Sequence, residues 1–446
     1  MYIVIGGAGD AGMHLGRLLR SGGHEVAFIE RDPEVAEEAR DIDALMIEGD
    51  VCDPQSLVDA GVRNCDYYMG LVTEDSANLA SCSLANYYGC QTIARIKSPS
   101  LLGDPYTQRY SRIGVDVALC PALIAASQVS RVLAFPSQLR GVRRKGIGTY
   151  HGVVESSSKS CANPLSEVAL PQGAQIVSIF RGIEQILPSD SLILRPEDEI
   201  CVFLDDKDKL EDVSESLGIP LRPYDEVRDV FIAGITDAGL TLAERLIESG
   251  MSVTVMALSE KDLKEAAESL PRASIIRSDP LGHDVLKREE IEHFDVLLAM
   301  GANMERNMLV SVLTKRFGVP TAIALIDRID LKESIEQTLV DDVVVPNLLL
   351  VKTLLSLVEE GGPLRRRTLQ TRDILTTEIE VKPKSRCVGK NVGKFSPANL
   401  GFLIAAVSKG ESNIVPDEEY VLSEGDRLTI LHRSQEYDTV KRWIMG

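Results

Sequence analysis

Apolar and polar positions in the first 30 residues follow the order strand, turn, helix, strand. Residues 2–5 and 26–29 are short apolar runs rich in β-forming side chains, which is typical of buried strands. Between these runs the apolar positions recur with a helical period. The leucines of this segment are expected on one side of the helix: Leu15, Leu18 and Leu19. The pattern therefore predicts a β-α-β unit at the start of the chain.

The same alternation continues to about residue 135. Further strands are expected at residues 44–47, 66–72, 92–96 and 116–119, and helices at residues 33–40, 54–60, 73–88, 106–113 and 121–135. Regular β/α alternation favours a parallel sheet with helices on both faces. The last of these helices is apolar all round, so it needs cover from either the next domain or a second subunit.

From residue 147 the strands become shorter and the turns more frequent. Strands are expected at residues 174–180, 185–187 and 199–204, followed by a helix at residues 207–217. This second pattern predicts a small α+β domain behind the α/β domain.

Both patterns then occur a second time. Gly7 has its counterpart 227 residues later, at Gly234. Other pairs keep nearly the same spacing: Asp50 and Asp279, Pro121 and Pro346, Gly182 and Gly410, Pro188 and Pro416, Asp198 and Asp426. A near-constant spacing over some 200 residues indicates a tandem duplication of a two-domain unit.

The expected fold class is therefore α/β, with two Rossmann-like doubly wound parallel-sheet domains, each followed by a small α+β domain. The expected boundaries are residues 1–135, 136–222, 228–362 and 368–446. Residues 361–363 (Gly-Gly-Pro) and the three arginines at 365–367 read as a solvated linker before the last domain rather than as a phosphate site.

Three glycines follow the first strand in GxGxxG spacing: Gly7, Gly9 and Gly12. The first permits the tight turn, the second lets a diphosphate approach the backbone, and the third lets the helix lie close to the strand. The helix N-terminus offers free N–H groups and the positive end of its dipole to phosphates. Glu30 ends the next strand, where a carboxylate can accept from ribose hydroxyls and repel a 2′-phosphate. A turn that merely joins strand and helix is the alternative, and the combination favours nucleotide binding.

Other candidates lie where strands end, because doubly wound sheets bind ligands at that edge. Asp50 could meet the adenine or its ribose, or cap the next helix. Thr73 could touch the nucleotide or cap the helix that follows it. Arg95, with Lys97 behind it, could reach phosphate in cis or from a neighbour, or form an ion pair with nearby acids. The remaining expected contacts are Ala8, Asp10, Ala11, Arg31, Val51 and Val72.

The second half has lost much of this chemistry. The changes are Thr236 for Gly9, Ala257 for Glu30 and Leu325 for Arg95. A β-branched side chain therefore stands at the point of closest phosphate approach, and the ribose acid is missing, although Asp279 remains. We expect the first half to bind an adenine nucleotide and the second to bind weakly, differently or not at all.

Composition narrows the functional classes. The net charge of −19 disfavours a nucleic-acid-binding face. Apolar runs stay below the ~18 residues of a membrane span, and no basic-then-apolar leader precedes the first strand, so a cytosolic protein is expected. The eight cysteines form no CxxC pair and no metal-ligand spacing with histidine, so they are expected to be reduced and no metal site is expected.

The motifs resemble the RCK (KTN) domain family. The N-terminal domain of that family is matched by residues 7–12, Glu30, Gly49-Asp50, residues 71–73 with Asn78, and residues 94–99, while residues 174–203 resemble its C-terminal domain. The tandem order over nearly the whole chain is similar to the peripheral regulatory subunits of Trk-type potassium uptake systems. By match of position, the family's nucleotide-contact roles fall on Gly7, Ala8, Gly9, Asp10, Ala11, Glu30, Thr73 and Arg95.

The resemblance implies a cytosolic homo-oligomer, a ring of four chains beneath a membrane potassium channel or transporter, that binds NAD(H) or ATP/ADP and gates its partner. Members often carry a glutamate after the proline at Pro121, which in some is a divalent-cation ligand. Ala122 stands there in this chain and Asn347 in the second half, so a metal site is not expected.

Two other functions fit parts of the pattern. An NAD-dependent oxidoreductase would explain the glycines and Glu30 but not the duplication, and the sequence shows no convincing His/Asp, Tyr/Lys or zinc-ligand set for hydride chemistry. A nucleotide-sensing regulator of another ion transporter would fit equally well, because partner choice lies in surface contacts. We therefore expect a protein that is not an enzyme.

Overall fold

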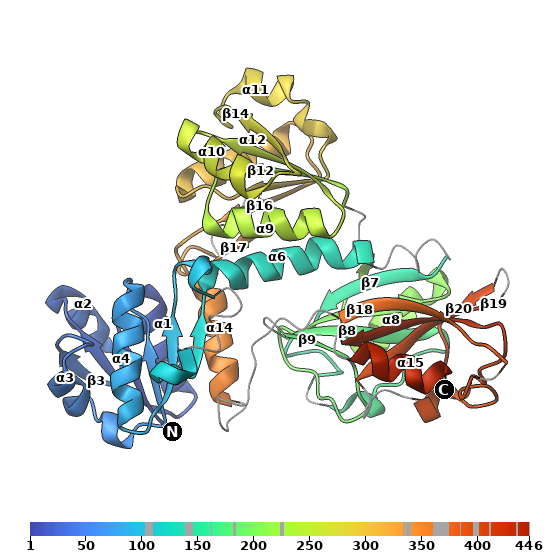
Figure 1. Cartoon of the computed structure of the whole chain (residues 1–446), viewed down its shortest axis with the longest axis horizontal. Coiled ribbons are helices and arrows are strands. Elements are labelled where there is room, and N and C mark those ends of the chain that lie inside the picture. Colours follow the sequence, from blue (N-terminus) through green and yellow to red (C-terminus); the bar gives the residue numbers. More distant parts are fainter. Residues whose placement is uncertain are drawn as a thin grey trace. The chain divides into compact units, whose positions relative to one another are not determined.

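The computed structural model in Figure 1 describes residues 1–102, 110–138, 146–161, 163–181, 184–223, 227–332, 335, 340–359, 374–383, 385–395, 401–409, 412–433 and 436–445. The chain divides into two compact units. The first consists of Met1–Arg131 and Val227–Leu369, and the second of Val132–Glu226 and Gln370–Gly446. Each unit therefore combines the corresponding domains of the two halves of the chain.

The first α/β domain, here called the first lobe, is a six-stranded parallel sheet in the order β3-β2-β1-β4-β5-β6. Its strands are β1 Tyr2–Gly6, β2 Glu25–Glu30, β3 Leu45–Glu48, β4 Tyr67–Gly70, β5 Gln91–Arg95 and β6 Val117–Leu119. Its helices are α1 Asp10–Ser21, α2 Pro33–Glu38, α3 Pro54–Asp59, α4 Asp75–Tyr87 and α6 Pro121–Gln138. Strand order reverses between β1 and β4, which opens a crevice at their carboxyl ends.

The second α/β domain, here called the second lobe, repeats this topology as β14-β13-β12-β15-β16-β17. Its strands are β12 Asp229–Ala233, β13 Ser252–Ala257, β14 Ser274–Arg277, β15 Val296–Ala299, β16 Thr321–Leu325 and β17 Asp342–Val344. Its helices are α9 Asp237–Glu248, α10 Glu260–Ser269, α11 His283–Arg288, α12 Met304–Arg316 and α14 Pro346–Glu359. The predicted duplication of a doubly wound fold is confirmed.

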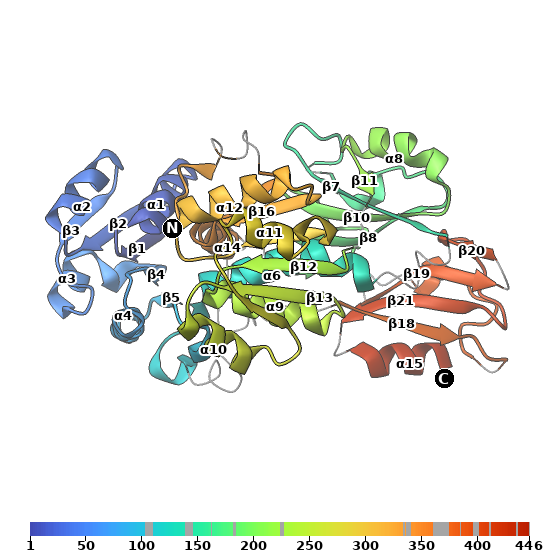
Figure 2. The same cartoon turned by 90° about the horizontal axis from the view of Figure 1, so that it is seen from above.

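The last helix of each lobe lies on the other lobe. Helix α14 packs against α1 of the first lobe, and both views place α6 beside α9 of the second lobe (Figures 1 and 2). Ile124, Ala125 and Val129 of α6 are buried. For these residues of the helix, the cover that the sequence required therefore comes from the other α/β domain of the same chain.

The small domains belong to the second unit. The first has an antiparallel sheet in the order β11-β7-β10-β8-β9, and the second has the order β18-β21-β19-β20. Their elements are β7 Gly148–Val153, β8 Ala174–Arg181, β9 Glu184–Ile186, β10 Glu199–Leu204, α8 Leu210–Leu217, β11 Arg222–Pro223, β18 Ile374–Glu380, β19 Phe402–Lys409, β20 Ser412–Ile414, β21 Arg427–Arg433 and α15 Tyr437–Met445. One apolar core joins the two sheets through residues that include Phe180, Phe203, Leu403 and Leu431.

Several local predictions need correction or stay open. Leu18 is 37% exposed, so of the three leucines only Leu15 and Leu19 lie on the buried side of α1. Residues 106–109 of the expected helix 106–113 lie outside the described residues, and Ser111–Ile113 is a 3-10 turn. The expected linker at 361–367 and the paired glycines 182 and 410 also lie outside them.

The expectation that all cysteines are reduced is wrong for one pair. Cys65 and Cys90 are joined by a disulfide, with their Cα atoms 5.8 Å apart. They precede neighbouring strands, β4 and β5, which pair in parallel and bring the two positions together. A separation of 25 residues in sequence gives no signal of this contact.

Candidate functional site

Among the predicted nucleotide residues, the glycine turn and Glu30 lie together at the carboxyl ends of β1 and β2. The carboxylate of Glu30 holds this arrangement together through hydrogen bonds to three backbone N–H groups. Its Oε2 accepts from the backbone N–H of Ala8 at 2.8 Å, and its Oε1 accepts from the N–H groups of Arg31 and Asp32 at 2.8 and 2.9 Å. The carboxylate is therefore fixed directly beside the glycine turn.

Two of the three glycines are demanded by the fold itself. Gly7 has φ +104°, a conformation that side-chain-bearing residues rarely adopt, and a Cβ there would lie 3.0 Å from Val72. A Cβ on Gly12 would lie 2.1 Å from the carbonyl oxygen of Gly7, so this glycine lets α1 lie against the turn. Both positions agree with the roles predicted from the spacing.

Gly9 is different, because nothing in the protein requires it. Its φ of −65° and ψ of −176° are open to any residue, and a Cβ there would meet no heavy atom within 4 Å. Gly9 is also the N-cap of α1 and, lacking a side chain, leaves the first turn of the helix without a side-chain cap. The turn therefore presents uncapped N–H groups to open space.

Asp10 begins α1 and marks where the second lobe approaches this turn. The backbone of Ile329 hydrogen-bonds to the Asp10 carboxylate. Burial raises the pKa of Asp10, and the nearby negative charge of Asp330 adds to this, while His14 and Arg328 oppose it. Ala8 and Ala11 on either side are buried.

A buried asparagine holds the next two strand ends together. Asn78 of α4 is fully buried, and its Oδ1 accepts from the N–H of Val72 at 3.0 Å. Its Nδ2 donates to the carbonyl oxygens of Val72 and Arg95, both at 2.8 Å. Asn307 makes the same three bonds in the second lobe, to Gly301 and Leu325. One feature of the sequence indicates this role, since Asn78 and Asn307 are 229 residues apart, as Asp50 and Asp279 are.

Asn78→Ala should destabilise the first lobe. It leaves three buried backbone groups without partners, at ~1–3 kcal/mol each, so we expect the free energy of unfolding to fall by about 3 kcal/mol or more. Asn307→Ala should cost a similar amount, and the exposed Asn163→Ala less than ~0.5 kcal/mol. Denaturant unfolding of the three variants measures this, and equal midpoints for Asn78→Ala and Asn163→Ala would contradict the bracing role.

Both capping alternatives raised by the sequence are wrong. Helix α3 is capped by Asp53, whose carboxylate accepts from the N–H of Ser56 at 2.9 Å. Asp50 instead accepts from the N–H of Cys52 at 2.8 Å, in a turn at the end of β3. The N-cap of α4 is Glu74 rather than Thr73. Val51 is buried in the core of the lobe.

The second lobe closes the equivalent turn. The Thr236 hydroxyl accepts from the N–H of Gly239 at 3.2 Å and donates to the carbonyl oxygen of Met300 at 2.9 Å. The side chain that replaces Gly9 therefore caps α9. Asp279, the acid that survives in this half, is ion-paired with Arg306 at 2.6 Å.

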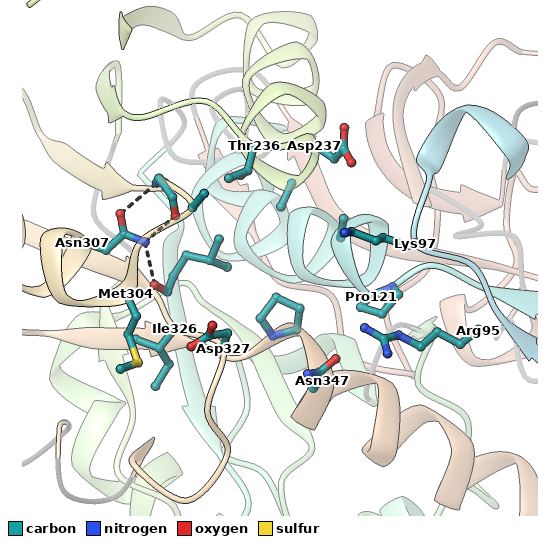
Figure 3. Close-up of a pocket in the computed structure, with 16 residues that line it drawn as sticks. Arg95, Lys97, Pro121, Thr236, Asp237, Met304, Asn307, Ile326, Asp327 and Asn347 are labelled. Atoms are coloured by element: carbon teal, nitrogen blue, oxygen red, sulfur yellow. Dashed lines mark hydrogen bonds between the residues drawn. The ribbon is translucent and has the colours of Figure 1, made fainter. Parts of the chain in front are cut away.

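Arg95 lies at the end of β5, and its side chain lines a cavity shared with the second lobe (Figure 3). Its buried Nε has no hydrogen-bond partner in the described part of the chain. Within these residues no ion pair of Arg95 is found, although the charge of Asp75 is close enough to act on it. The predicted residue is therefore at a strand end as expected, and it faces the other lobe.

Comparison with known families decides the assignment. The model described as the TrkA-N domain matches residues 3–121 and 230–346, and the one described as the TrkA-C domain matches residues 153–218 and 376–445. The chain belongs to the TrkA-N domain family. The two TrkA-N domains are the first and second lobes, and the TrkA-C domains are the small antiparallel domains.

Relatives share this architecture over their whole length. The Trk system potassium uptake protein TrkA homolog 1 of Methanosarcina mazei is 26% identical over 455 residues and covers both chains fully. The TrkA homolog of Archaeoglobus fulgidus is 27% identical over 99% of each chain. TrkA of Haemophilus influenzae is 25% identical over 96% of this chain and 95% of its own.

Solved structures show the same fold. The GsuK channel bound to NAD aligns with a TM-score of 0.55 and 15% identity, over 98% of this chain and 78% of that chain. The GsuK RCK domain aligns with a TM-score of 0.52 over 99% of this chain and 94% of its own. At this identity the likeness concerns the fold alone.

The described residues contain no group of three or more His, Cys, Asp or Glu side chains placed to hold a metal ion. Among their helices, none combines the length and apolar character needed to cross a bilayer.

Proposed function

We propose that this TrkA-N domain protein is a regulatory subunit that binds an adenine nucleotide in its first lobe and thereby controls potassium transport by a membrane partner. The observation that carries the proposal is the open, uncapped first turn of α1 at Gly9, set beside the fixed carboxylate of Glu30. This pair of features is absent from the second lobe, where Thr236 and Ala257 stand.

The ligand is NAD(H) or ATP/ADP, which share an adenosine diphosphate moiety. Its phosphates lie on the N-terminal turn of α1, where N–H groups and the helix dipole favour negative charge. Its adenosine ribose hydroxyls donate to Glu30. Asp50 with Val51 follows β3, Val72 with Thr73 follows β4, and these residues complete the walls on either side. Because these groups bind and position a nucleotide, and the relatives are named as potassium uptake proteins, we propose that the protein is not an enzyme.

The partner is proposed from the relatives. Their names place them in Trk potassium uptake systems, and they match this chain from end to end. We propose a homo-oligomeric ring, a tetramer, on the cytoplasmic face of the membrane, attached through a Trk-type channel or transporter subunit.

Nucleotide binding acts by shifting the equilibrium between shapes of the assembly, because a ligand with equal affinity for both shapes shifts nothing. The contact of Asp10 with Ile329 and the packing of α14 on α1 link the nucleotide turn to the second lobe. A typical coupling of ~1–3 kcal/mol per site, summed over several sites in a ring, reaches the ~5.5 kcal/mol that swings an equilibrium from 1:99 to 99:1.

Potassium flux tests the proposal. The full chain, co-purified with a Trk-type membrane subunit and placed in vesicles, should change the rate of potassium uptake several-fold when NADH, ATP or ADP is added. Glu30→Arg should bind the membrane subunit but lose this response. Normal regulation of the Glu30→Arg complex would reject the first-lobe site. Consumption of NADH at 340 nm with candidate substrates would instead support an oxidoreductase.

A further inference from the structure

A disulfide closes the part of the first lobe that forms one wall of the proposed nucleotide site. It joins Cys65, just before β4, to Cys90, just before β5. Residues 65–90, here called the closed segment, contain β4, the loop with Thr73, and helix α4 with its buried Asn78. Helix α4 packs on β4 and β5 (Figure 2). The bond therefore fixes both ends of the closed segment at the edge of the sheet opposite the nucleotide turn.

The two cysteines of this bond differ in their access to solvent. Cys65 is partly exposed, whereas Cys90 is only 2% exposed and belongs to the apolar core of the lobe. A reagent in solution therefore reaches the bond from the side of Cys65. The Sγ atom of Cys90 lies 2.9 Å from the carbonyl oxygen of Val62, so a thiol at Cys90 has an acceptor for its proton inside the core.

Non-covalent contacts hold the same two ends together. The N–H of Gln91 donates to the carbonyl oxygen of Asp66 at 3.1 Å, which pairs the residues that follow the two cysteines. The guanidinium of Arg63 lies over the ring of Tyr88, 5.9 Å from its centroid. Reduced cysteines also pack in a core as small apolar side chains. We therefore expect the lobe to keep its fold when the bond is reduced, and the closed segment to open more often.

The proposed cytoplasmic placement favours a reversible bond over a permanent one. Cellular thiols keep cysteines reduced in that compartment, and outside hyperthermophiles the disulfides found there are usually transient, catalytic or redox-sensing. Exposed disulfides are also easier to reduce than buried ones. A partly exposed bond that closes one wall of a ligand site fits the redox-sensing class.

We propose that Cys65 and Cys90 form a reversible thiol–disulfide site, through which a dithiol reductant sets the mobility of the closed segment and thereby the nucleotide affinity of the first lobe. A cross-link restricts the chain that it closes, so its removal makes local opening more frequent. A wall that must first be ordered lowers the affinity for its ligand. The statement on affinity rests on the function proposed above, whereas reversibility and mobility do not.

The reaction exchanges one disulfide for another. A thiolate of the dithiol attacks the sulfur of Cys65, forms a new S–S bond with it and releases Cys90 as a thiolate, which takes a proton from water. The second thiol of the reductant loses its proton and attacks the reductant's own bonded sulfur. This step closes the reductant's disulfide and releases Cys65, which is protonated in turn. Two electrons thus pass from the dithiol to the cysteine pair, and the same steps in reverse, starting from an oxidised dithiol, restore the bond.

Dithiothreitol, a small dithiol, tests the proposal on the native full chain. Alkylation after denaturation should count six free thiols in the oxidised chain and eight after reduction, and oxidised dithiothreitol should restore the first count. Hydrogen exchange of the α4 amides should become at least ~tenfold faster on reduction, while exchange in α9 of the second lobe stays the same. Calorimetry should show ADP affinity lower by about fivefold or more in the reduced chain.

Two variants control the experiment. Cys65→Ser should show the fast α4 exchange and the weaker ADP binding without dithiothreitol, and should not respond to it. Cys161→Ser removes a partly exposed cysteine that is free, and it should respond as the wild type does. A bond that stays closed under excess dithiothreitol until the chain is denatured would overturn the proposal. So would α4 exchange, or ADP affinity, that is the same in the oxidised and reduced chains. If the oxidised chain bound no ADP, the proposed nucleotide site would fail, while faster α4 exchange on reduction would still support the reversible site.

Discussion

Gly9→Thr should abolish adenine-nucleotide binding while leaving the protein as stable as before. A Cβ at this position meets no protein atom within 4 Å, and the backbone conformation suits any residue, so the fold loses nothing. The added side chain fills the space over the first turn of α1. As Thr236 does in the second lobe, its hydroxyl would also take an N–H that the phosphates need. We expect affinity to fall at least ~100-fold, or about 2.8 kcal/mol.

Gly22→Thr is the matched control. Gly22 ends the same helix, has φ −76°, and a Cβ there would make only ordinary contacts at 3.4 Å or more. Calorimetric titration with ADP, ATP and NADH measures affinity, and thermal unfolding without ligand measures stability. The free energy of unfolding of Gly9→Thr should stay the same or rise by up to ~1 kcal/mol, because a glycine is removed from the unfolded chain. If Gly9→Thr bound nucleotide with unchanged affinity, the phosphates would not bind at this turn.

The contrast between Gly9 and Gly7 shows what the sequence could and could not provide. The spacing GxGxxG, the strands around it and the acid at Glu30 predicted the topology and the turn, because hydrophobic period and glycine position are local features. The spacing alone does not say which glycine serves the fold and which serves a ligand. That distinction needs the surroundings of each Cβ, which come from residues distant in sequence such as Val72.

Contacts between lobes could not be predicted at all. Asp10 meets Ile329 and Arg95 faces Thr236 across segments more than 100 residues apart, and no periodicity encodes such pairs. The sequence alone therefore leaves open whether Arg95 reaches phosphate or an acid, and whether a domain or a subunit covers α6. The disulfide between Cys65 and Cys90 was missed for the same reason, since only strand pairing brings the two residues together.

The duplication of the chain helps to separate structural residues from ligand-binding residues. Residues that recur at a constant spacing are either structural or functional, and their second copies help to separate the two. Asn78 and Asn307 both persist and make identical bonds, as expected of a structural brace. Glu30 has no acidic counterpart, because Ala257 stands there, so its carboxylate is not required to build the fold. Comparing the halves of one chain thus points to Glu30 as a ligand-binding residue.

Glu30→Gln should change which nucleotide the first lobe prefers. The carboxylate accepts the two ribose hydroxyl hydrogens in NADH and repels the 2′-phosphate of NADPH, whereas an amide keeps one acceptor, adds a donor and carries no charge. A hydrogen bond to a charged group contributes ~1.5–3 kcal/mol. Affinity for NADH should therefore fall about tenfold or more, and affinity for NADPH should rise, so that the ratio shifts ~100-fold.

Glu34→Gln, an exposed acid in the first turn of α2, is the control for loss of one charge from the same region. Fluorescence titration of the full chain with NADH and NADPH gives both affinities, and thermal unfolding checks that loss of the Glu30 bonds to Ala8 and Arg31 has not disturbed the turn. If the ratio of NADH affinity to NADPH affinity were the same in Glu30→Gln and Glu34→Gln, the ribose would lie elsewhere. If Glu30→Gln instead lost affinity for NADH and NADPH equally and unfolded at a lower temperature, Glu30 would be assigned to holding the turn. Loss of charge repulsion alone would change the affinity for NADPH only.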